Sequence, residues 1–363
     1  MRIAMAGCRG IPARWGGVER VVEDITAELS HMGHEVIVYG RGGYVPVDQP
    51  PTAGRVIVTP GLGGKHLDAI THTFTAMLDV KRRGVDVLHV HSPGPALTSF
   101  IAAGHMPIVF TVHAPDWRRD KWSRMAKCVL EAGLACGMKR ASAVTAVSEP
   151  LARELSARFG RHVEYVPNGV RPPRAGARAD VNDMGLTADD YALFVGRIVP
   201  EKRLDLLIKC WAGLNVTSTL AVAGEMCSDA YCRHCRDLAQ GLNVKFLGGV
   251  YGPRLESLYA NAAVVVQPSV LEGMSLVLLE AASHARCIVC SDIEENVALL
   301  GEAGVYFRVD DGAQLVAALS RCSLEEAFRR RMGSMALSRA KLFDVSRSAR
   351  SYEAIYTRLV GGG

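Results

Sequence analysis

The sequence contains few cysteines and no long apolar run, and each scarcity excludes a class of protein. Ten cysteines among 363 residues fall far below the density of a disulfide-stabilised secreted scaffold. No apolar run approaches the roughly 20 residues that a membrane-spanning helix needs. No secretory leader is recognisable either. We therefore expect a cytoplasmic protein with reduced thiols.

The excess of positive charge is confined to the first half of the chain. Residues 1–172 contain 21 Lys and Arg against 15 Asp and Glu, whereas residues 173–363 contain 21 against 22. No stacking or recognition motif for nucleic acid accompanies the basic half, so we expect no nucleic-acid partner. An anionic membrane surface or a phosphate-bearing acceptor explains the asymmetry better.

Short apolar runs alternate with helical stretches from end to end, which predicts an α/β protein with parallel sheets. A stretch rich in Pro, Arg and Gly, residues 171–179, interrupts the pattern before it restarts. We therefore expect two Rossmann-like domains, 1–172 and 173–344, whose parallel sheets face each other across a cleft. The expected strands are 3–6, 35–39, 55–59, 86–91, 108–113, 143–147, 164–167, 192–196, 219–223, 244–247, 263–267, 287–291 and 305–308.

Two carboxylates flank a strand-to-helix transition late in the chain. Residues 262–269 form an apolar run that predicts a buried parallel strand, and residues 276–282 predict a buried helix. Glu272 lies in the intervening loop, and Glu280 lies about two turns along the helix. A glutamate inside so apolar a helix suggests a ligand, because a buried unpaired charge is costly.

The start of this helix is a candidate anion site. Backbone N–H groups at a helix N-terminus point outward and favour negative charge. The groups that we expect to face a ligand belong to Gly273, Met274, Ser275 and Leu276.

A second helix N-terminus follows the first strand. Gly16 and Gly17 precede a stretch whose apolar residues recur at helical spacing. The surrounding glycine spacing fits neither the dinucleotide fingerprint nor a P-loop. Either these glycines form a plain turn, or their backbone N–H groups approach a phosphate.

Arg197 and Lys202 form the next candidate pair. Both follow an expected strand, on the loop that enters a helix. Two fixed cations at such a place suit a diphosphate leaving group. Isolated surface cations usually have no function, so the interpretation depends on the sequence around them.

His113 closes another expected strand, and a basic segment follows it. A lone histidine at a strand end is commonly structural. The basic segment contains apolar residues at helical spacing, which suits a helix at a membrane interface as well as an ordinary solvated face. Its basic residues are Arg118, Arg119, Lys121, Arg124, Lys127, Lys139 and Arg140.

One cluster has the residue types of a metal site, namely Cys227, Cys232, His234 and Cys235. Zinc sites usually show paired short spacings with separated knuckles, and this spacing is irregular. Free thiols on a helix are the favoured alternative, and we expect no bound metal.

The Glu-x7-Glu spacing of Glu272 and Glu280 resembles the signature of the retaining family-4 glycosyltransferases, which have the two-domain GT-B fold. The Gly-Arg…Glu-Lys pattern of residues 196–202 is similar to a second motif of that family. Residues 111–122 resemble a segment of a bacterial branch that acts in surface-glycan assembly. With further likenesses at 145–149 and 166–170, the resemblance covers nearly the whole chain.

The resemblance implies roles for the matching residues. Glu272 and His113 would lie beside the donor sugar, and Glu280 would bind the ribose hydroxyls. The Gly16-Gly17 pair would meet the donor pyrophosphate. The expected catalytic residues are therefore His113, Arg197, Lys202 and Glu272. The expected donor-binding residues are Gly16, Gly17, Arg197, Lys202, Val250 (beside the nucleobase), Glu272, Gly273, Met274, Ser275, Leu276 and Glu280.

The resemblance also implies the activity. We expect a retaining, metal-independent glycosyltransferase that uses a nucleotide-sugar donor, a UDP-sugar being favoured, and a glycan or lipid-linked acceptor. No cofactor is expected, because the sequence contains no Asp-x-Asp motif. A C-terminal helix at 345–360 would pack back on the first domain, and the enzyme would act at the inner face of the cell membrane. The alternatives are a nucleotide-sugar epimerase or hydrolase on the same fold, or a non-catalytic nucleotide-sugar-binding subunit.

Overall fold

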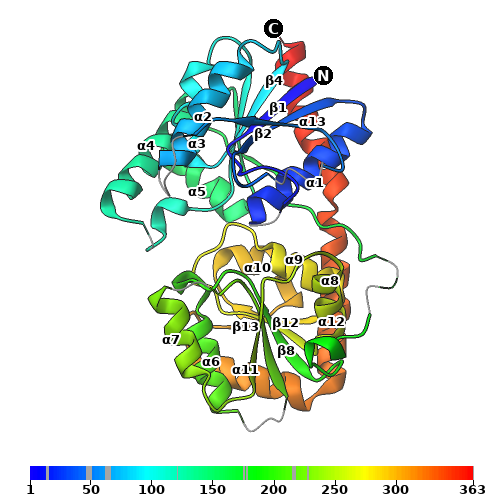
Figure 1. Cartoon of the computed structure of the whole chain (residues 1–363). Helices are drawn as coiled ribbons and strands as arrows, with labels where there is room; N and C mark the ends of the chain where they lie inside the picture. The colour runs from blue at the N-terminus through cyan, green and yellow to red at the C-terminus, as the bar shows by residue number, and fades with distance from the viewer. Residues whose placement is uncertain are drawn as a thin grey trace. The chain divides into compact units, whose positions relative to one another are not determined.

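The chain folds into two compact units (Figure 1). Unit 1 comprises Met1–Gly169 together with Val345–Gly363, and unit 2 comprises Val170–Asp344. The passage between them at Gly169 lies slightly before residue 172. The computed structural model describes residues 1–13, 16–45, 51–61, 67–120, 122–174, 176, 179–214, 218–226 and 229–362.

Unit 1 contains a seven-stranded parallel sheet in the order β3-β2-β1-β4-β5-β6-β7. The strand order reverses between β1 and β4, and ligands of open α/β sheets bind at such a switch point, outside the carboxyl ends of the strands. The strands are β1 (Arg2–Ala6), β2 (Glu35–Arg41), β3 (Arg55–Thr59), β4 (Val87–His91), β5 (Ile108–Val112), β6 (Ala143–Ala146) and β7 (Glu164–Tyr165).

Helices cover this sheet, and the sequence explains where several of them begin and end. Ser123 caps α4 by accepting a hydrogen bond from the Ala126 N–H group. Gly160 ends α5 in the left-handed conformation, with φ of 60°. The helices are α1 (Gly17–His31), α2 (Leu67–Val80), α3 (Pro93–Ala96), α4 (Arg124–Arg140), α5 (Glu149–Phe159) and α13 (Val345–Gly361), with 3-10 turns η1 (Ser99–Ile101) and η2 (Asp116–Arg118).

Unit 2 contains a six-stranded parallel sheet in the order β10-β9-β8-β11-β12-β13. Here the order reverses between β8 and β11. The strands are β8 (Tyr191–Val195), β9 (Thr219–Ala223), β10 (Val244–Gly248), β11 (Val264–Gln267), β12 (Cys287–Ser291) and β13 (Val305–Phe307).

The helices of unit 2 follow the same alternation. Ser275 and Asp311 cap two of them by accepting hydrogen bonds from backbone N–H groups. The helices are α6 (Leu204–Ala212), α7 (Ala230–Leu238), α8 (Gly252–Asn261), α9 (Leu276–Ser283), α10 (Glu294–Leu300), α11 (Gly312–Leu324) and α12 (Glu326–Ala340). The 3-10 turns are η3 (Asn182–Met184), η4 (Pro200–Lys202), η5 (Gly301–Ala303) and η6 (Lys341–Phe343).

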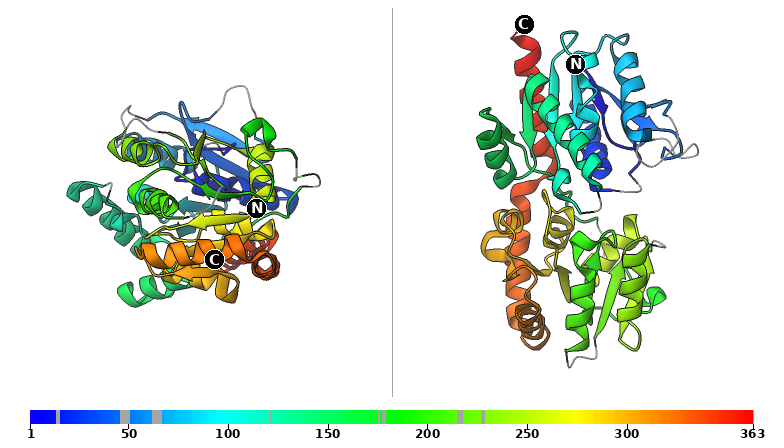
Figure 2. Two further views of the ribbon diagram at one scale, coloured as in Figure 1. Left: turned by 90° about the horizontal axis from the view of Figure 1, so that it is seen from below. Right: turned by 90° about the vertical axis from the view of Figure 1, so that its left-hand side faces the viewer.

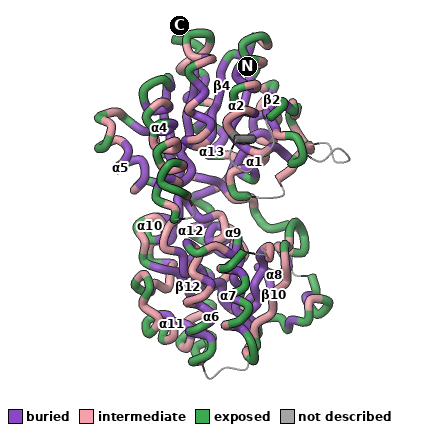
Figure 3. Tube along the Cα trace, turned by 60° about the vertical axis from the view of Figure 1, so that its left-hand side comes forward, coloured by how far each residue is buried: buried purple, intermediate pink, exposed green. Residues whose placement is uncertain are grey.

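The central strands of both units are buried on both faces. Strands β4 and β12 are buried along their whole length (Figure 3). Parallel strands covered by helices on both sides are usually continuous apolar runs. Strand β4 is an exception, because His89 and His91 alternate with its aliphatic residues. These buried polar groups need partners.

The C-terminal helix α13, orange to red in Figure 2, belongs to unit 1 and packs against α1. Tyr352 and Tyr356 of this helix are buried. The chain leaves unit 1 after Gly169 and re-enters it at Val345, and these two residues lie next to each other in space. A Cβ atom added to Gly169 would lie 2.2 Å from the Val345 Cα atom.

All thirteen expected strands are present, and the expected α/β class with two parallel sheets is confirmed. The differences lie at strand ends. Strand β7 stops at Tyr165, and Pro167 has no N–H group with which to extend a ladder. Strand β5 stops at Val112, so His113 follows the strand rather than closing it.

Candidate active site

Glu272 is the centre of a buried polar network in unit 2. Only 8% of its surface is exposed. Its Oε1 atom accepts hydrogen bonds from Lys202 Nζ at 2.5 Å and from Gln267 Nε2 at 2.5 Å. The network therefore contains a nearly desolvated ion pair between the loop after β11 and the turn after β8.

The sequence led us to expect the wrong glutamate to be buried. Glu280, on the apolar helix α9, is half-buried, whereas the loop residue Glu272 is buried. The helix is short and one side of it remains partly accessible at Glu280. The loop folds over Glu272, because Lys202 and Gln267 provide the partners that a buried carboxylate needs.

Helix α9 begins where the sequence predicts it. Leu276 is its first residue and Ser275 is its cap, with the hydroxyl accepting from the Leu278 N–H group at 3.4 Å. Gly273 and Met274 therefore belong to the preceding loop. Of the four N–H groups expected to face an anion, those of Ser275 and Leu276 lie at the start of the helix, and those of Gly273 and Met274 lie in the loop that leads into it.

Arg197 and Lys202 both follow β8, but their surroundings differ. Arg197 is exposed, whereas Lys202 ends the 3-10 turn η4 and only 14% of its side chain is exposed. The next residue, Arg203, adopts the left-handed conformation with φ of 50° and precedes α6. The ammonium group of Lys202 is thus presented together with the carboxylate of Glu272.

Glu280 faces the buried hydroxyl of Tyr259 on α8. Burial, together with the negative charge of Glu280, holds the pKa of Tyr259 well above its usual value. The Tyr259 ring also stacks on His284 with 5.8 Å between centroids. Glu280 is therefore placed at the interface of α8 and α9.

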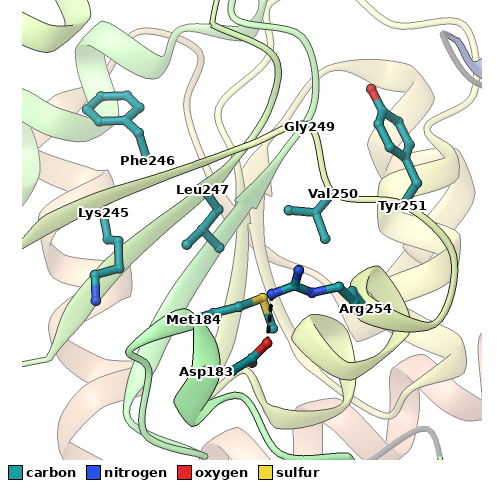
Figure 4. Close-up of a pocket in the computed structure, with 9 residues that line it drawn as sticks. All are labelled: Asp183, Met184, Lys245, Phe246, Leu247, Gly249, Val250, Tyr251 and Arg254. Carbon is teal, nitrogen blue, oxygen red and sulfur yellow. Dashed lines mark hydrogen bonds and ion pairs between the residues drawn. The ribbon is translucent and has the colours of Figure 1, made fainter.

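Val250 lines a pocket of about 460 Å³ beside the edge strand β10 (Figure 4). Its side chain points toward Leu247 and Arg254, whereas Tyr251 turns away and donates to Glu225 Oε1 at 3.0 Å. None of the expected sugar or diphosphate contacts lines this pocket. The lining residues are Asp183, Met184, Lys245, Phe246, Leu247, Gly249, Val250, Tyr251 and Arg254.

Gly16 caps α1 in unit 1, and Gly17 is the first residue of that helix. Glu19 reaches back toward this cap, and its Oε1 atom accepts from the Arg9 N–H group at 3.0 Å. A Cβ atom on Gly16 would lie 2.4 Å from Glu19 Oε2. The glycine therefore leaves room for the Glu19 carboxylate at the start of α1. The neighbouring Arg14 and Trp15 lie outside the described residues.

His113 is buried at the carboxyl end of β5, beside a second histidine. His91 Nδ1 and His113 Nε2 lie 2.9 Å apart, at the ends of adjacent strands. Burial lowers the pKa of His113 to about 4, and it lowers that of His91 well below the usual value. Both rings are therefore neutral at pH 7.

A third histidine connects this pair to the C-terminal helix. His89 packs against His91 with 4.0 Å between the centroids of the tilted rings. Its Nδ1 atom lies 2.7 Å from the Tyr356 hydroxyl, and its Nε2 atom lies 2.6 Å from Thr111 Oγ1. Burial lowers the pKa of His89 to about 3.

The basic segment of unit 1 is partly neutralised by acidic neighbours. Arg118 pairs with Glu154 at 2.5 Å, and Arg119 pairs with Asp116 at 2.8 Å. Lys121 lies outside the described residues. Of the remaining cations on α4, Lys127 lies 3.5 Å from Asp120, and Arg124, Lys139 and Arg140 are exposed.

The cysteine-rich cluster is divided between the core and the surface. Cys232 and Cys235 are buried in the core of unit 2, whereas His234 is exposed. Cys227 lies outside the described residues. Among the residues that are described, no three His, Cys, Asp or Glu side chains are placed to hold one metal ion.

The sequence interpretation missed three polar residues of these sites. Gln267 and His91 end apolar strands, and Glu19 lies three residues after the cap of α1. A polar residue that closes a buried strand was the available indication for the first two. A glutamate at that helix position is typical of a capping box.

Comparison with known proteins defines the class. A model for Glycosyltransferase Family 4 matches residues 15–174, and a model for glycosyl transferases group 1 matches residues 189–324. The enzyme is therefore a glycosyltransferase with the GT-B fold. The chain belongs to glycosyltransferase family 4, as the Glu-x7-Glu motif predicts.

Related proteins match between half and nearly all of the chain. An uncharacterized glycosyltransferase of Methanocaldococcus jannaschii is 27% identical over 81% of this chain and 81% of its own. A D-inositol 3-phosphate glycosyltransferase of Kineococcus radiotolerans is 27% identical over 95% of this chain and 91% of its own. The N-acetylgalactosamine-N,N'-diacetylbacillosaminyl-diphospho-undecaprenol 4-alpha-N-acetylgalactosaminyltransferase of Campylobacter jejuni is 28% identical over 52% and 51%.

Solved structures share the fold over the full chain. Sucrose-phosphate synthase from Thermosynechococcus elongatus has a TM-score of 0.86 at 20% identity, and covers 100% of both chains. HepE from Anabaena in complex with UDP-glucose has a TM-score of 0.82 at 19% identity, and covers 99% of this chain and 100% of its own.

Proposed function

We propose that this enzyme is a retaining glycosyltransferase that moves a hexose from a nucleotide sugar, a UDP-sugar being favoured, to a glycan or lipid-linked acceptor. The observation that carries the proposal is the buried Lys202–Glu272 pair at the carboxyl edge of the unit 2 sheet. It combines a cation for a diphosphate with a carboxylate for sugar hydroxyls. The UDP-glucose complex of HepE supports the donor class. The undecaprenol diphosphate in the name of the Campylobacter relative supports the acceptor class.

The proposed mechanism is electrostatic. Lys202 and Arg197 stabilise the negative charge that develops on the departing diphosphate. The backbone N–H groups of Gly16 and Gly17 direct the positive ends of their dipoles at the same diphosphate. When the diphosphate binds, the Lys202 ammonium is shared between the phosphate and Glu272, so the carboxylate becomes available to sugar hydroxyls.

The other residues position the donor and the reacting carbon. Glu280 binds the ribose hydroxyls, and the backbone beside Val250 meets the nucleobase. His113, which is neutral at pH 7, offers a hydrogen bond to the sugar without adding charge. The acceptor hydroxyl approaches from the face that the diphosphate leaves, which retains the anomeric configuration without an enzymic nucleophile.

We propose that no metal ion takes part. Arg197 and Lys202 supply the positive charge that a divalent cation supplies in metal-dependent transferases. The purified chain should therefore consume a nucleotide sugar in excess chelator at the rate measured with added magnesium. Loss of turnover in chelator, restored by magnesium or manganese, would overturn this part of the proposal.

The decisive experiment screens nucleotide sugars against the purified chain in chelator, with a panel of saccharide and lipid-linked acceptors. A bound donor stabilises the folded chain by mass action, which thermal unfolding detects. The transfer product, analysed by NMR, should have the anomeric configuration of the donor. An inverted product would exclude retention. Absence of both donor stabilisation and turnover across the panel would overturn the proposed function.

A further inference from the structure

Gln267 is a buried polar residue at the end of an otherwise aliphatic strand. It closes β11, after Val264, Val265 and Val266, and only 1% of its surface is exposed. An amide in this position must satisfy both its donors and its acceptor within the protein, because an unmet buried polar group costs about 1–3 kcal/mol.

Both ends of the Gln267 amide are engaged. Its Nε2 atom donates to Glu272 Oε1 at 2.5 Å and to Ser269 Oγ at 3.3 Å. Its Oε1 atom accepts from Ser275 Oγ at 2.7 Å. The amide thus connects the carboxylate of Glu272 to the residue that caps α9.

The orientation of this amide is determined by chemistry. A carboxylate only accepts hydrogen bonds, so the NH₂ group must face Glu272. The Ser275 hydroxyl donates to the amide oxygen while its own oxygen accepts from the Leu278 N–H group. Reversing the amide would place two acceptor oxygens against each other beside Glu272. One side-chain orientation is therefore strongly preferred.

We propose that Gln267 is a positioning residue that holds the Glu272 carboxylate in the direction required for donor binding. Lys202 attracts the same carboxylate, but an ammonium on a flexible four-carbon stem does not define its direction. Gln267 is planar and anchored at both ends. It also links Glu272 to α9, the helix that carries Glu280, so the two motif glutamates keep a constant separation. This inference rests on the proposed function of Glu272.

The test uses two substitutions of Gln267 with different consequences. Gln267→Met keeps the length of the side chain and removes all three hydrogen bonds of the amide. Gln267→Glu places a second carboxylate against Glu272, and this repulsion should raise the pKa of the pair. Gln240, an exposed amide of unit 2 that lies 3.5 Å from Asp237, supplies the matched controls Gln240→Met and Gln240→Glu.

Steady-state kinetics over a range of pH measure the role. Gln267→Met should lower kcat by about 10–100-fold, the usual effect of a misplaced catalytic group, while thermal unfolding shows a folded chain. Gln267→Glu should move the acid limb of kcat/KM upward by about one pH unit. The Gln240 variants should match the unmodified enzyme.

Each outcome decides the proposal. If Gln267→Met loses thermal stability but keeps kcat and the pH profile, Gln267 is a structural residue only and the proposal is overturned. The proposal is also overturned if Gln267→Glu has the same pH profile of kcat/KM as the unmodified enzyme. If Gln267→Glu does not fold, the pH profile of Gln267→Met decides in its place. Glu272→Gln separates this failure from a failure of the proposed function. If Glu272→Gln turns over normally, the role of Glu272 itself is wrong.

Discussion

At the scale of single residues, the Lys202–Glu272 pair joins stability to chemistry. A buried ion pair is destabilised strongly when one partner is removed, because the other is left as an uncompensated charge. Glu272 retains only neutral partners among its described hydrogen bonds once Lys202 is removed. A variant at either position therefore alters the site and the folded state together.

We predict different behaviour for the two proposed leaving-group cations. Lys202→Ala should lower turnover by about 10²–10³-fold and also lower the free energy of unfolding by on the order of 2 kcal/mol. Arg197→Ala should lower turnover similarly with little loss of stability, because Arg197 is exposed. Kinetics and urea unfolding of both variants measure these effects. Wild-type turnover in a folded Lys202→Ala variant would remove the assignment.

The residue scale is also where sequence interpretation was least complete. The types and spacing of Glu272, Glu280, Arg197 and Lys202 were sufficient to suggest a nucleotide-sugar site. Which glutamate is buried was not predictable, because burial depends on how a loop folds over a side chain. The role of Gln267 was not predictable either, because its hydrogen-bond partners Ser269, Glu272 and Ser275 lie in the following loop and at the cap of α9.

At the scale of secondary-structure elements, strands β4 and β5 bring three neutral histidines into the core of unit 1. His89, His91 and His113 all have a pKa below the usual value because burial disfavours the charged imidazolium. The unfolded chain titrates near 6.5 at each of them. Below that pH the unfolded state takes up protons that the folded state does not.

We therefore predict that the free energy of unfolding falls as the pH decreases from about 6.5 toward 4. Each histidine should remove about 2 kcal/mol by pH 5. Urea unfolding at several pH values should show this slope, monitored in unit 1. The double variant His89→Gln, His91→Gln replaces two titrating rings by neutral amides, so its slope should be markedly smaller.

His105→Gln supplies the control for this experiment. His105 is an exposed histidine of the same unit, so its replacement should leave the slope unchanged. An equal slope in the unmodified chain and in the double variant would show that other groups cause the acid sensitivity.

At the scale of the whole molecule, the fold was largely predictable and the surface interactions were not. Apolar runs of strand length identified every strand of both sheets, because parallel strands covered on two faces contain little else. The described residues contain no helix with the length and hydropathy needed to cross a bilayer. Binding to a membrane surface depends on which charged side chains are neutralised by ion pairs, and the sequence does not show these pairs.

We propose that the exposed cations of α4 bind an anionic membrane surface, where each contributes about 1 kcal/mol. Met125, with 78% of its surface exposed, lies beside Arg124 and offers an apolar contact on the same helix. The protein should sediment with anionic liposomes at low salt and be released at high salt. Charge reversal at Arg124, Lys139 and Arg140 should abolish sedimentation.

A matched reversal in unit 2 separates a specific surface from a general effect of net charge. Lys209, Arg236 and Arg331 are exposed there, and reversing them should leave sedimentation unchanged. Equal losses in both triple variants would indicate net charge alone. An unmodified protein that ignores anionic liposomes at low salt would favour an acceptor in solution.

The return of the chain to unit 1 has a consequence for synthesis on the ribosome. Unit 2 is complete once Asp344 has emerged, since the Val170 N–H group donates to the Phe343 carbonyl oxygen at 2.8 Å and so joins its two ends. Unit 1 has to wait for its last helix, although most of its residues emerge first. At ordinary elongation rates this delay is about 10–40 s. During that time His89 and Thr111 lack the tyrosines that later cover them, so the first part of the enzyme to be translated is the last to finish folding.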